Sequence, residues 1–299
     1  MVLMEFTHLF TPLNVIAALL ALAPYLAAAF FPRASVDCVR AFPVWVQFGS
    51  PAILCVPYLL VACGAGDFHW QWLALYAVLP VAVVILLWQA ACVDPGQRGN
   101  WRDFLALIVL GLAVDLRWFE GAWPAHLAIF NKVLLLDAGI YGFVLIRQLG
   151  GTGFDLRLSL IDLGIGLREA AFYTPIALAL GLWLSFLHLH RLWPTPALLV
   201  GAWIFTFFFI AVPEELFFRG WLQNLLEKRL GRFAALLLTA CLFGLAHFNK
   251  RTTTFNWQYV LLAAIAGIFY GRAWRQQRRV GASAITHATV DTIWSLWLR

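Results

Sequence analysis

Long apolar runs alternate along this chain with short segments that carry most of its charged residues. Several of the runs approach the ~20 apolar residues that a helix needs to span a bilayer. The pattern predicts an all-α, polytopic integral-membrane helical bundle of about 8–10 transmembrane helices. The expected spans are 13–31, 42–63, 71–92, 104–119, 125–146, 170–190, 196–226, 232–248, 257–271 and 281–298.

The composition leads to the same class of protein. Apolar residues make up 63% of the chain and charged residues only 12%, whereas soluble domains carry about 25% charged residues. No basic residue precedes the first apolar run, so a cleavable signal peptide is not expected. The five cysteines are scattered without a metal-ligand spacing, and we interpret them as small core residues.

The basic residues gather on one side of the expected topology. With the N-terminus outside, fourteen of the 21 lysines and arginines fall in cytoplasmic segments and five in outer segments, which is the usual bias of cytoplasmic loops. Both termini are then outside. Only three of the 21 are lysines, which favours a GC-rich genome and hence the bacterial inner (plasma) membrane. Membrane lipid is an expected partner, and no nucleic acid is expected.

The Gly150–Gly153 segment is the best internal boundary, because glycine-rich segments punctuate structured regions. Residues 1–150 then form N-terminal transmembrane helices of unassigned role, and residues 151–299 form a second unit that holds the polar residues discussed next. Segment 154–169 carries too many charges to cross the bilayer, so we expect it in the cytoplasmic interface. Its alternation of leucines and charges fits either a strand or a helix.

Two adjacent glutamates interrupt one of the most apolar stretches, next to Pro213. A charged side chain at bilayer depth costs roughly 2.5–3.5 kcal/mol and usually faces a polar cavity. Glu215 and Arg219 lie four residues apart on one helix face and can pair. Glu214 points about 100° away around the helix, and a kink at Pro213 would open room beside it. A buried ion pair that locks two helices is the alternative, but it leaves Glu214 unexplained.

Two further spans carry histidines. Phe243 lies one turn before His247, and His287 shares a helix face with Asp291. Each histidine has a structural alternative: His247 as an interfacial residue bonded to a loop carbonyl, and His287 as a bundle residue oriented by Asp291. The functional interpretation of His247 is a neutral imidazole that accepts a proton or binds a metal. No HExxH motif occurs, so metal ligands would come from separate helices.

The order and spacing of these motifs, Glu-Glu-x-x-x-Arg, Phe-x-x-x-His and His-x-x-x-Asp, resembles the CPBP family (CAAX-processing and bacteriocin-processing intramembrane proteases), which includes the type II CAAX prenyl endopeptidases. The resemblance covers roughly residues 155–298. It implies an intramembrane endopeptidase that cleaves a membrane-associated protein or peptide. The implied catalytic residues are Glu214 with its water-activating partner His247, and the oxyanion-stabilising pair His287 and Asp291; Glu215, Arg219 and Phe243 are implied as supporting residues.

The resemblance leaves several points open. One divalent metal ion, zinc, held by Glu214, His247 and His287 is one alternative, and a metal-free, glutamate-activated water is the other. Many members of the family have asparagine where Asp291 stands, so Asp291 either donates to the oxyanion in its protonated form or orients His287 in its ionised form. A catalytically silent immunity or scaffold protein of the same fold, and a proton-coupled transporter, are the rival functions.

Overall fold

The computed structural model describes residues 11–124, 127–190, 193–250 and 254–298. Within these ranges the chain folds into helices and connecting segments, and no strand occurs there. The all-α prediction is confirmed. The chain divides into two compact units, Met1–Gly150 and Gly151–Arg299. That the second unit is a protease domain, and that the first consists of transmembrane helices without an assigned role, stays a prediction.

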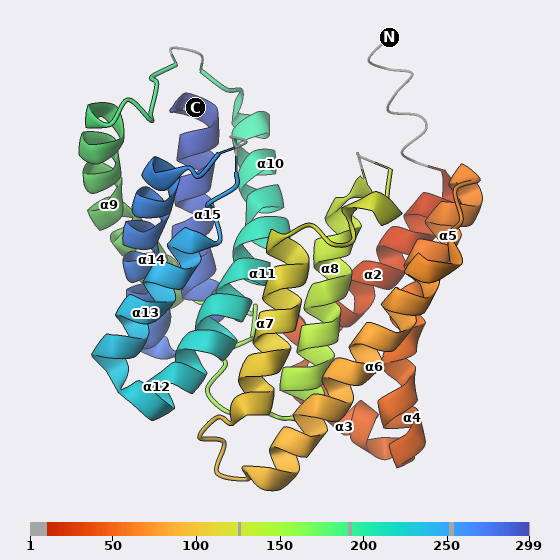
Figure 1. Ribbon diagram of the computed structural model, residues 1–299. Coiled ribbons are helices and arrows are strands. Elements are labelled where there is room, and N and C mark those ends of the chain that lie inside the picture. Colours follow the sequence, from red (N-terminus) through yellow and green to blue (C-terminus); the bar gives the residue numbers. More distant parts are fainter. Residues whose placement is uncertain (1–10, 125–126, 191–192, 251–253, 299) are drawn as a thin grey trace. The chain divides into compact units, whose positions relative to one another are not determined.

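The N-terminal unit contains a core of packed aromatic rings. Tyr58, Tyr76 and Trp123 pack ring against ring at 5.8–5.9 Å between centroids. The buried Arg147 guanidinium pairs with Asp103 at 3.0 Å and Asp94 at 2.8 Å. The described elements are α2 (Pro12–Phe30), α3 (Pro32–Ala41), α4 (Val44–Gly49), η1 (Ser50–Cys55), α5 (Val56–Ala65), α6 (Trp70–Val93), α7 (Trp101–Asp115), η2 (Glu120–Ala122), α8 (Ile129–Gly139) and η4 (Ile140–Ile146) (Figure 1).

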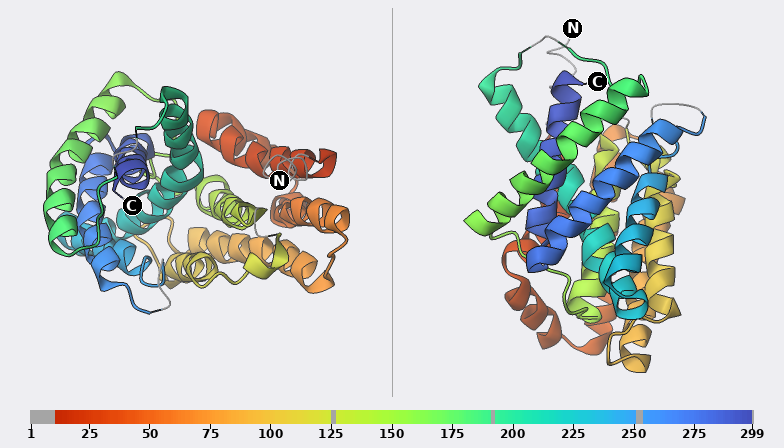
Figure 2. Two further views of the ribbon diagram at one scale, coloured as in Figure 1. Left: turned by 90° about the horizontal axis from the view of Figure 1, so that it is seen from above. Right: turned by 90° about the vertical axis from the view of Figure 1, so that its left-hand side faces the viewer.

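The C-terminal unit surrounds its last long helix. Helix α15 contacts α9, α10 and α14, and it lies among them when the molecule is seen from above (Figure 2). A polar side chain in the middle of α15 is therefore enclosed by protein. The described elements are α9 (Leu160–Trp183), α10 (Pro196–Thr206), η5 (Phe207–Ala211), α11 (Val212–Glu215), η6 (Leu216–Gln223), α12 (Asn224–Leu230), α13 (Arg232–Leu245), α14 (Trp257–Gln277) and α15 (Val280–Trp297).

Six helical segments among the described residues are long and apolar enough to cross a membrane. Each of the ten expected spans also has a helical counterpart, although α7 and α13 are shorter than a full span. The candidate spans are Pro12–Phe30, Val44–Ala65, Trp70–Val93, Ile129–Ile146, Leu160–Trp183 and Pro196–Leu230.

The conformation that the sequence left open for residues 160–169 is helical, because they form the first turns of α9. That segment 154–169 lies in the cytoplasmic interface stays a prediction. Ser159 starts the helix, since its hydroxyl accepts from the Asp162 amide while the Asp162 carboxylate accepts from the Ser159 amide. The charges that suggested an interfacial segment have protein partners. Asp162 pairs with Arg279 at 2.9 Å, and the buried Glu169 pairs with Arg272 at 3.2 Å.

Gly166 permits close packing of α9 on α15. A methyl group at this position would lie 2.6 Å from the Ile285 side chain, whereas one at Gly164 would meet nothing within 4 Å. We expect Gly166→Ala to lower the free energy of unfolding by about 1–3 kcal/mol through overpacking. Gly164→Ala should raise it by up to about 1 kcal/mol, because alanine is the better helix former. Thermal unfolding of the two purified variants checks this, and equal shifts in melting temperature would contradict the packing argument.

The topology prediction concerns the end of α14 and the C-terminus. Arginines at 272, 275, 278 and 279 crowd one end of this helix, so we expect segment 272–280 to be cytoplasmic. Helix α15 then leads to an outside C-terminus. A reporter active only after export should be active when fused after residue 299 and inactive when inserted after Arg278. Activity in the opposite positions would reverse the predicted orientation.

Candidate active site

The two glutamates lie where the long helical run Pro196–Leu230 changes its winding. A single α-helical turn, Val212–Glu215, separates the π-helical segments Phe207–Ala211 and Leu216–Gln223. Pro213, where the sequence predicted a kink, has no backbone N–H to donate, and the helix is irregular on both sides of it. π-Helical turns often occur at functional sites because they redirect side chains. The turn buries the Glu215 side chain completely and leaves that of Glu214 21% exposed.

Glu215 is the centre of a buried polar network. One of its oxygens, Oε2, lies 3.1 Å from the Arg219 Nε and also accepts a hydrogen bond from the Ser283 hydroxyl. The other, Oε1, lies 2.9 Å from Nδ1 of His287. The predicted pair of Glu215 and Arg219 is present. Its link to His287 was not predicted, although Ser283 lies four residues before His287 and offers a polar face on the same helix.

Arg219 is enclosed by aromatic rings as well as by its carboxylate partner. Its guanidinium carbon lies 5.0 Å from the ring centroid of Phe243, 5.8 Å from that of Phe218 and 5.9 Å from that of Tyr270. These distances suit cation–π attraction, which is strongest where water is excluded. Arg219 therefore joins the first motif to the aromatic walls that also enclose the two histidines.

His287 is held in one orientation by three neighbours, Glu215, Tyr270 and Phe243. Because a carboxylate only accepts, Nδ1–H of His287 donates to Glu215. The Tyr270 ring stacks on the imidazole at 4.6 Å, and the Phe243 ring meets it edge-on at 5.6 Å. The other ring nitrogen, Nε2, consequently faces the Asp291 Oδ2 at 3.4 Å and the Glu214 Oε2 at 3.9 Å.

His247 lies just after the end of α13 and is buried. Its Nδ1 is 2.8 Å from the carbonyl oxygen of Phe243. Because a carbonyl oxygen only accepts, Nδ1 carries the proton, and Nε2 of the neutral ring is left as an acceptor. The Phe243 and Tyr259 rings pack on the imidazole at 4.9 and 4.8 Å. Phe243 thus contacts both histidines, and its supporting role stays a prediction.

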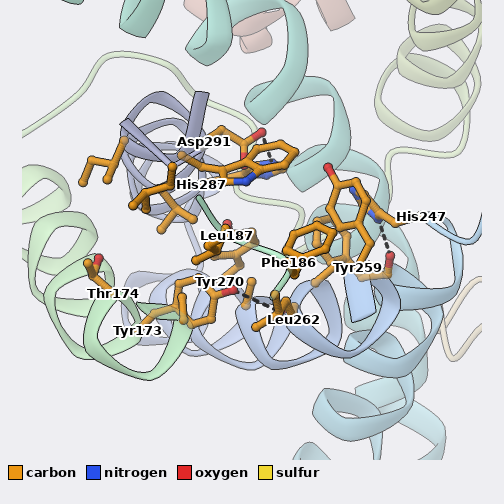
Figure 3. Close-up of a pocket in the computed structure, with 18 residues that line it drawn as sticks. Tyr173, Thr174, Phe186, Leu187, His247, Tyr259, Leu262, Tyr270, His287 and Asp291 are labelled. Carbon is orange, nitrogen blue, oxygen red and sulfur yellow. Dashed lines mark hydrogen bonds and ion pairs between the residues drawn. The ribbon is translucent and has the colours of Figure 1, made fainter. Parts of the chain in front are cut away.

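A cavity of about 70 Å³ opens between α9, α14 and α15 and the end of α13 (Figure 3). This volume holds at least one water molecule. Three of the four predicted catalytic residues line the cavity: His247, His287 and Asp291. The fourth, Glu214, is not part of the lining. The other lining residues are Tyr173, Thr174, Ala177, Phe186, Leu187, Phe243, Tyr259, Leu262, Ala263, Ala266, Tyr270, Val290, Ile293, Trp294 and Leu298.

Part of the aromatic lining was not predicted. Phe186 follows α9 and stacks on Trp294 of α15 at 6.3 Å, and Trp294 also contacts Tyr259 at 5.4 Å. The loop that carries Phe186 is tied to the end of α15, because the amide of His190 donates to the carbonyl of Trp297 at 2.8 Å. No motif marks these residues, so the sequence alone could not place them beside the histidines.

Across the described ranges, no group of three or more His, Cys, Asp or Glu side chains is placed to hold a metal ion. Zinc bound by Glu214, His247 and His287 stays a prediction. Among these side chains, Glu214 and the unprotonated Nε2 of His247 are hydrogen-bond acceptors, and Nε2 of His287 faces Glu214 and Asp291.

One known protein family matches the part of the chain that contains these motifs. Residues 195–293 match the family model described as type II CAAX prenyl endopeptidase Rce1-like. The matched residues lie within the C-terminal unit. The match runs from the start of α10 to within α15 and includes all four predicted catalytic residues. No curated protein and no solved structure matches the chain.

The Rce1-like match confirms the predicted resemblance to the CPBP proteases. Together with the six apolar helices, it makes this chain an integral, multi-pass membrane protein. It also supports a membrane CAAX-protease function in general. The match starts after α9, which packs against α14 and α15 and contributes Tyr173 to the cavity.

Proposed function

We propose that this chain is an intramembrane endopeptidase that hydrolyses a peptide bond in a membrane-associated protein or peptide, with water as the nucleophile. One observation carries the proposal: Nε2 of His287 faces both Glu214 and Asp291, and His247 lines the same cavity. Residues of the second and third motifs thus line one small cavity with aromatic walls, and Glu214 of the first motif contacts His287 beside it. The Rce1-like match favours proteolysis as the chemistry of this space.

In the proposed reaction, Glu214 and His247 activate a water molecule. Glu214 takes one proton from the water, while the unprotonated Nε2 of His247 accepts the second hydrogen bond and holds the water in line with the scissile carbonyl. Attack forms a tetrahedral intermediate. When the C–N bond breaks, Glu214 returns the proton to the leaving amine, so the free carboxylate is restored for the next cycle.

His287 and Asp291 serve the oxyanion in this proposal. Glu215 holds Nδ1–H of His287, so the ring presents Nε2 to the site. When the ring carries both protons, Nε2–H donates to the oxyanion, a contribution typically worth a few kcal/mol. Glu215 and Arg219 act indirectly, because they orient His287 as partners behind a catalytic histidine do.

The geometry makes Asp291 secondary to Glu215 in orienting His287. We therefore expect Asp291→Asn to retain kcat/KM within about tenfold of wild type, because Glu215 still holds the ring and an amide can donate to the oxyanion. Glu215→Gln is the matched comparison, and it should reduce kcat/KM far more. Peptide cleavage rates of the two purified variants decide the point. A collapse of activity in Asp291→Asn at every pH would show that its carboxylate is required.

The proposed function is tested with purified protein in lipid nanodiscs. Two fluorogenic peptides with the same C-terminal CAAX sequence, one prenylated and one not, are incubated with wild type and with Glu214→Gln. We expect the wild type to cleave and Glu214→Gln not to cleave. Mass spectrometry of the products locates the cleaved bond. A preference for the prenylated peptide would name the substrate class. A bacterial leader peptide is offered as a third substrate. If the folded wild-type protein cleaves none of the three peptides, the catalytically silent scaffold is the better interpretation.

A further inference from the structure

A second hollow in the C-terminal unit is lined almost entirely by arginines. Helices α13 and α14 pack antiparallel, with Gly267 against Ala240 and Gly271 against Leu236, so α13 begins where α14 ends. Arg232 from the first position of α13 and three arginines from the end of α14 surround a hollow of about 280 Å³. None of its residues belongs to the candidate active site. We call it the arginine pocket; its lining is Arg232, Arg272, Arg275, Gln276 and Arg278.

Two buried carboxylates hold the arginines of α14 in place. Glu227, whose side chain is 4% exposed, lies 3.2 Å from Nε of Arg275 and 2.6 Å from Nη2 of Arg278. Glu169 is fully buried and lies 3.2 Å from Nε of Arg272. The arginine side chains themselves stay partly exposed. The carboxylates therefore fix the guanidinium groups from the protein side, as residues behind a binding site do.

This arrangement leaves positive charge directed at the hollow. Arg272 and Arg275 contact Glu169 and Glu227 through Nε, at 3.2 Å each, and their side chains stay 46% and 24% exposed. Arg232 is exposed and forms none of these ion pairs. Four guanidinium groups against two carboxylates give the arginine pocket a net charge of about +2. Planar guanidinium forks suit the oxygens of a phosphate, which they bind through paired hydrogen bonds.

The apolar surface beside the arginine pocket favours a lipid headgroup over a free phosphate as the ligand. Phe233 follows Arg232 directly and is 72% exposed, and Leu230, Leu237 and Leu238 of the same region are also exposed. Such side chains suit contact with acyl chains in a membrane protein. A phosphate held at the end of this apolar strip would thus lie at the level of lipid headgroups, where basic residues attract anionic lipid.

We propose that the arginine pocket binds the phosphate headgroup of an anionic glycerophospholipid, with its acyl chains along the exposed apolar face of α13. The site is independent of the proposed peptidase chemistry. It would place a bound lipid at one end of α14. Lipid binding by the C-terminal unit would then depend on the lipid composition of the membrane, independently of the catalytic residues.

The experiment measures lipid binding by native mass spectrometry of the delipidated full chain. Phosphatidylglycerol is titrated against phosphatidylcholine of the same acyl composition for wild type, for Arg232→Gln and for the double variant Arg232→Gln/Arg275→Gln. Glu227 keeps Arg278 as a partner in the double variant, so no buried carboxylate is stranded. The control is Arg157→Gln, which removes an exposed arginine that pairs with Asp155 outside the pocket.

We expect wild type and the Arg157 control to prefer phosphatidylglycerol. The dissociation constant for phosphatidylglycerol should be about tenfold or more higher in the double variant than in wild type. In Arg232→Gln it should rise by a smaller factor. Unchanged binding in these variants, or equal binding of both lipids by wild type, would overturn the proposal. Glycerol phosphate is the last arm: if it displaces the lipid at equal concentration, the site recognises phosphate alone and the lipid assignment is wrong. If the double variant does not fold, Arg232→Gln alone decides.

Discussion

Glu214→Gln is expected to abolish peptide cleavage while the protein remains folded in the membrane. General-base catalysis contributes about 10²–10⁴-fold, so the cleavage rate should fall by at least two orders of magnitude. The structure predicts a small cost in stability. The Glu214 carboxylate is partly exposed, and its contacts with His287 and Lys250 are both long, at 3.9 Å. Glutamine keeps the size of the side chain and removes only the base.

A matched control separates this loss from a general effect of losing a glutamate. Glu120→Gln changes an exposed glutamate of the N-terminal unit that pairs with Arg117 at 3.6 Å, and its cleavage rate should equal that of wild type. Melting temperatures of both variants should lie close to wild type. If Glu214→Gln retains more than about a tenth of the wild-type rate, Glu214 is not the base.

Arg219→Ala should have the largest effect on stability. It removes the cation from a completely buried pair and leaves Glu215 charged in an apolar surrounding, a change that typically costs about 3–5 kcal/mol. It also removes the contacts of the guanidinium with three aromatic rings. We expect a low yield of membrane-inserted protein, a melting temperature well below wild type, and loss of activity because Glu215 can no longer hold His287.

Arg168→Ala is the comparison for this prediction. Its guanidinium also pairs with a fully buried carboxylate, that of Glu169, but the arginine is half exposed. Glu169 keeps Arg272 and Gln276 as partners after the change. The cost should therefore stay within about 1 kcal/mol. Thermal unfolding of the purified variants measures both effects, and equal destabilisation would show that burial of the Arg219 pair is not what matters.

Local rules were enough to predict the first motif and the class of fold. Apolar run length predicted the helices, and a spacing of four residues predicted the pair of Glu215 and Arg219, which the structure contains. The contact of Glu215 with His287 joins residues far apart in the chain and depends on how α15 packs. Nothing in the spacing within either motif encodes that packing, so Glu215 was predicted as a partner of Arg219 alone.

The start of α9 shows a second limit of sequence patterns. The alternation of leucines and charges in segment 154–169 fitted either a strand or a helix, and residues 160–169 form a helix. Asp162 and Glu169 have arginine partners more than one hundred residues away in the sequence, Arg279 and Arg272. Burial by those partners lets a charged segment begin a long helix. The cavity lining after α9 is unpredictable for the same reason, because it depends on the contact of Phe186 with Trp294.

The central claim is that water activated by Glu214, not Glu214 itself, attacks the peptide bond. A single turnover of peptide by excess purified enzyme in water enriched in ¹⁸O tests this directly. The account predicts one ¹⁸O atom in the new carboxylate of the product, because the attacking oxygen comes from solvent. A product without ¹⁸O in that first turnover would contradict it, since the oxygen would then come from an enzyme carboxylate that had bonded to the substrate.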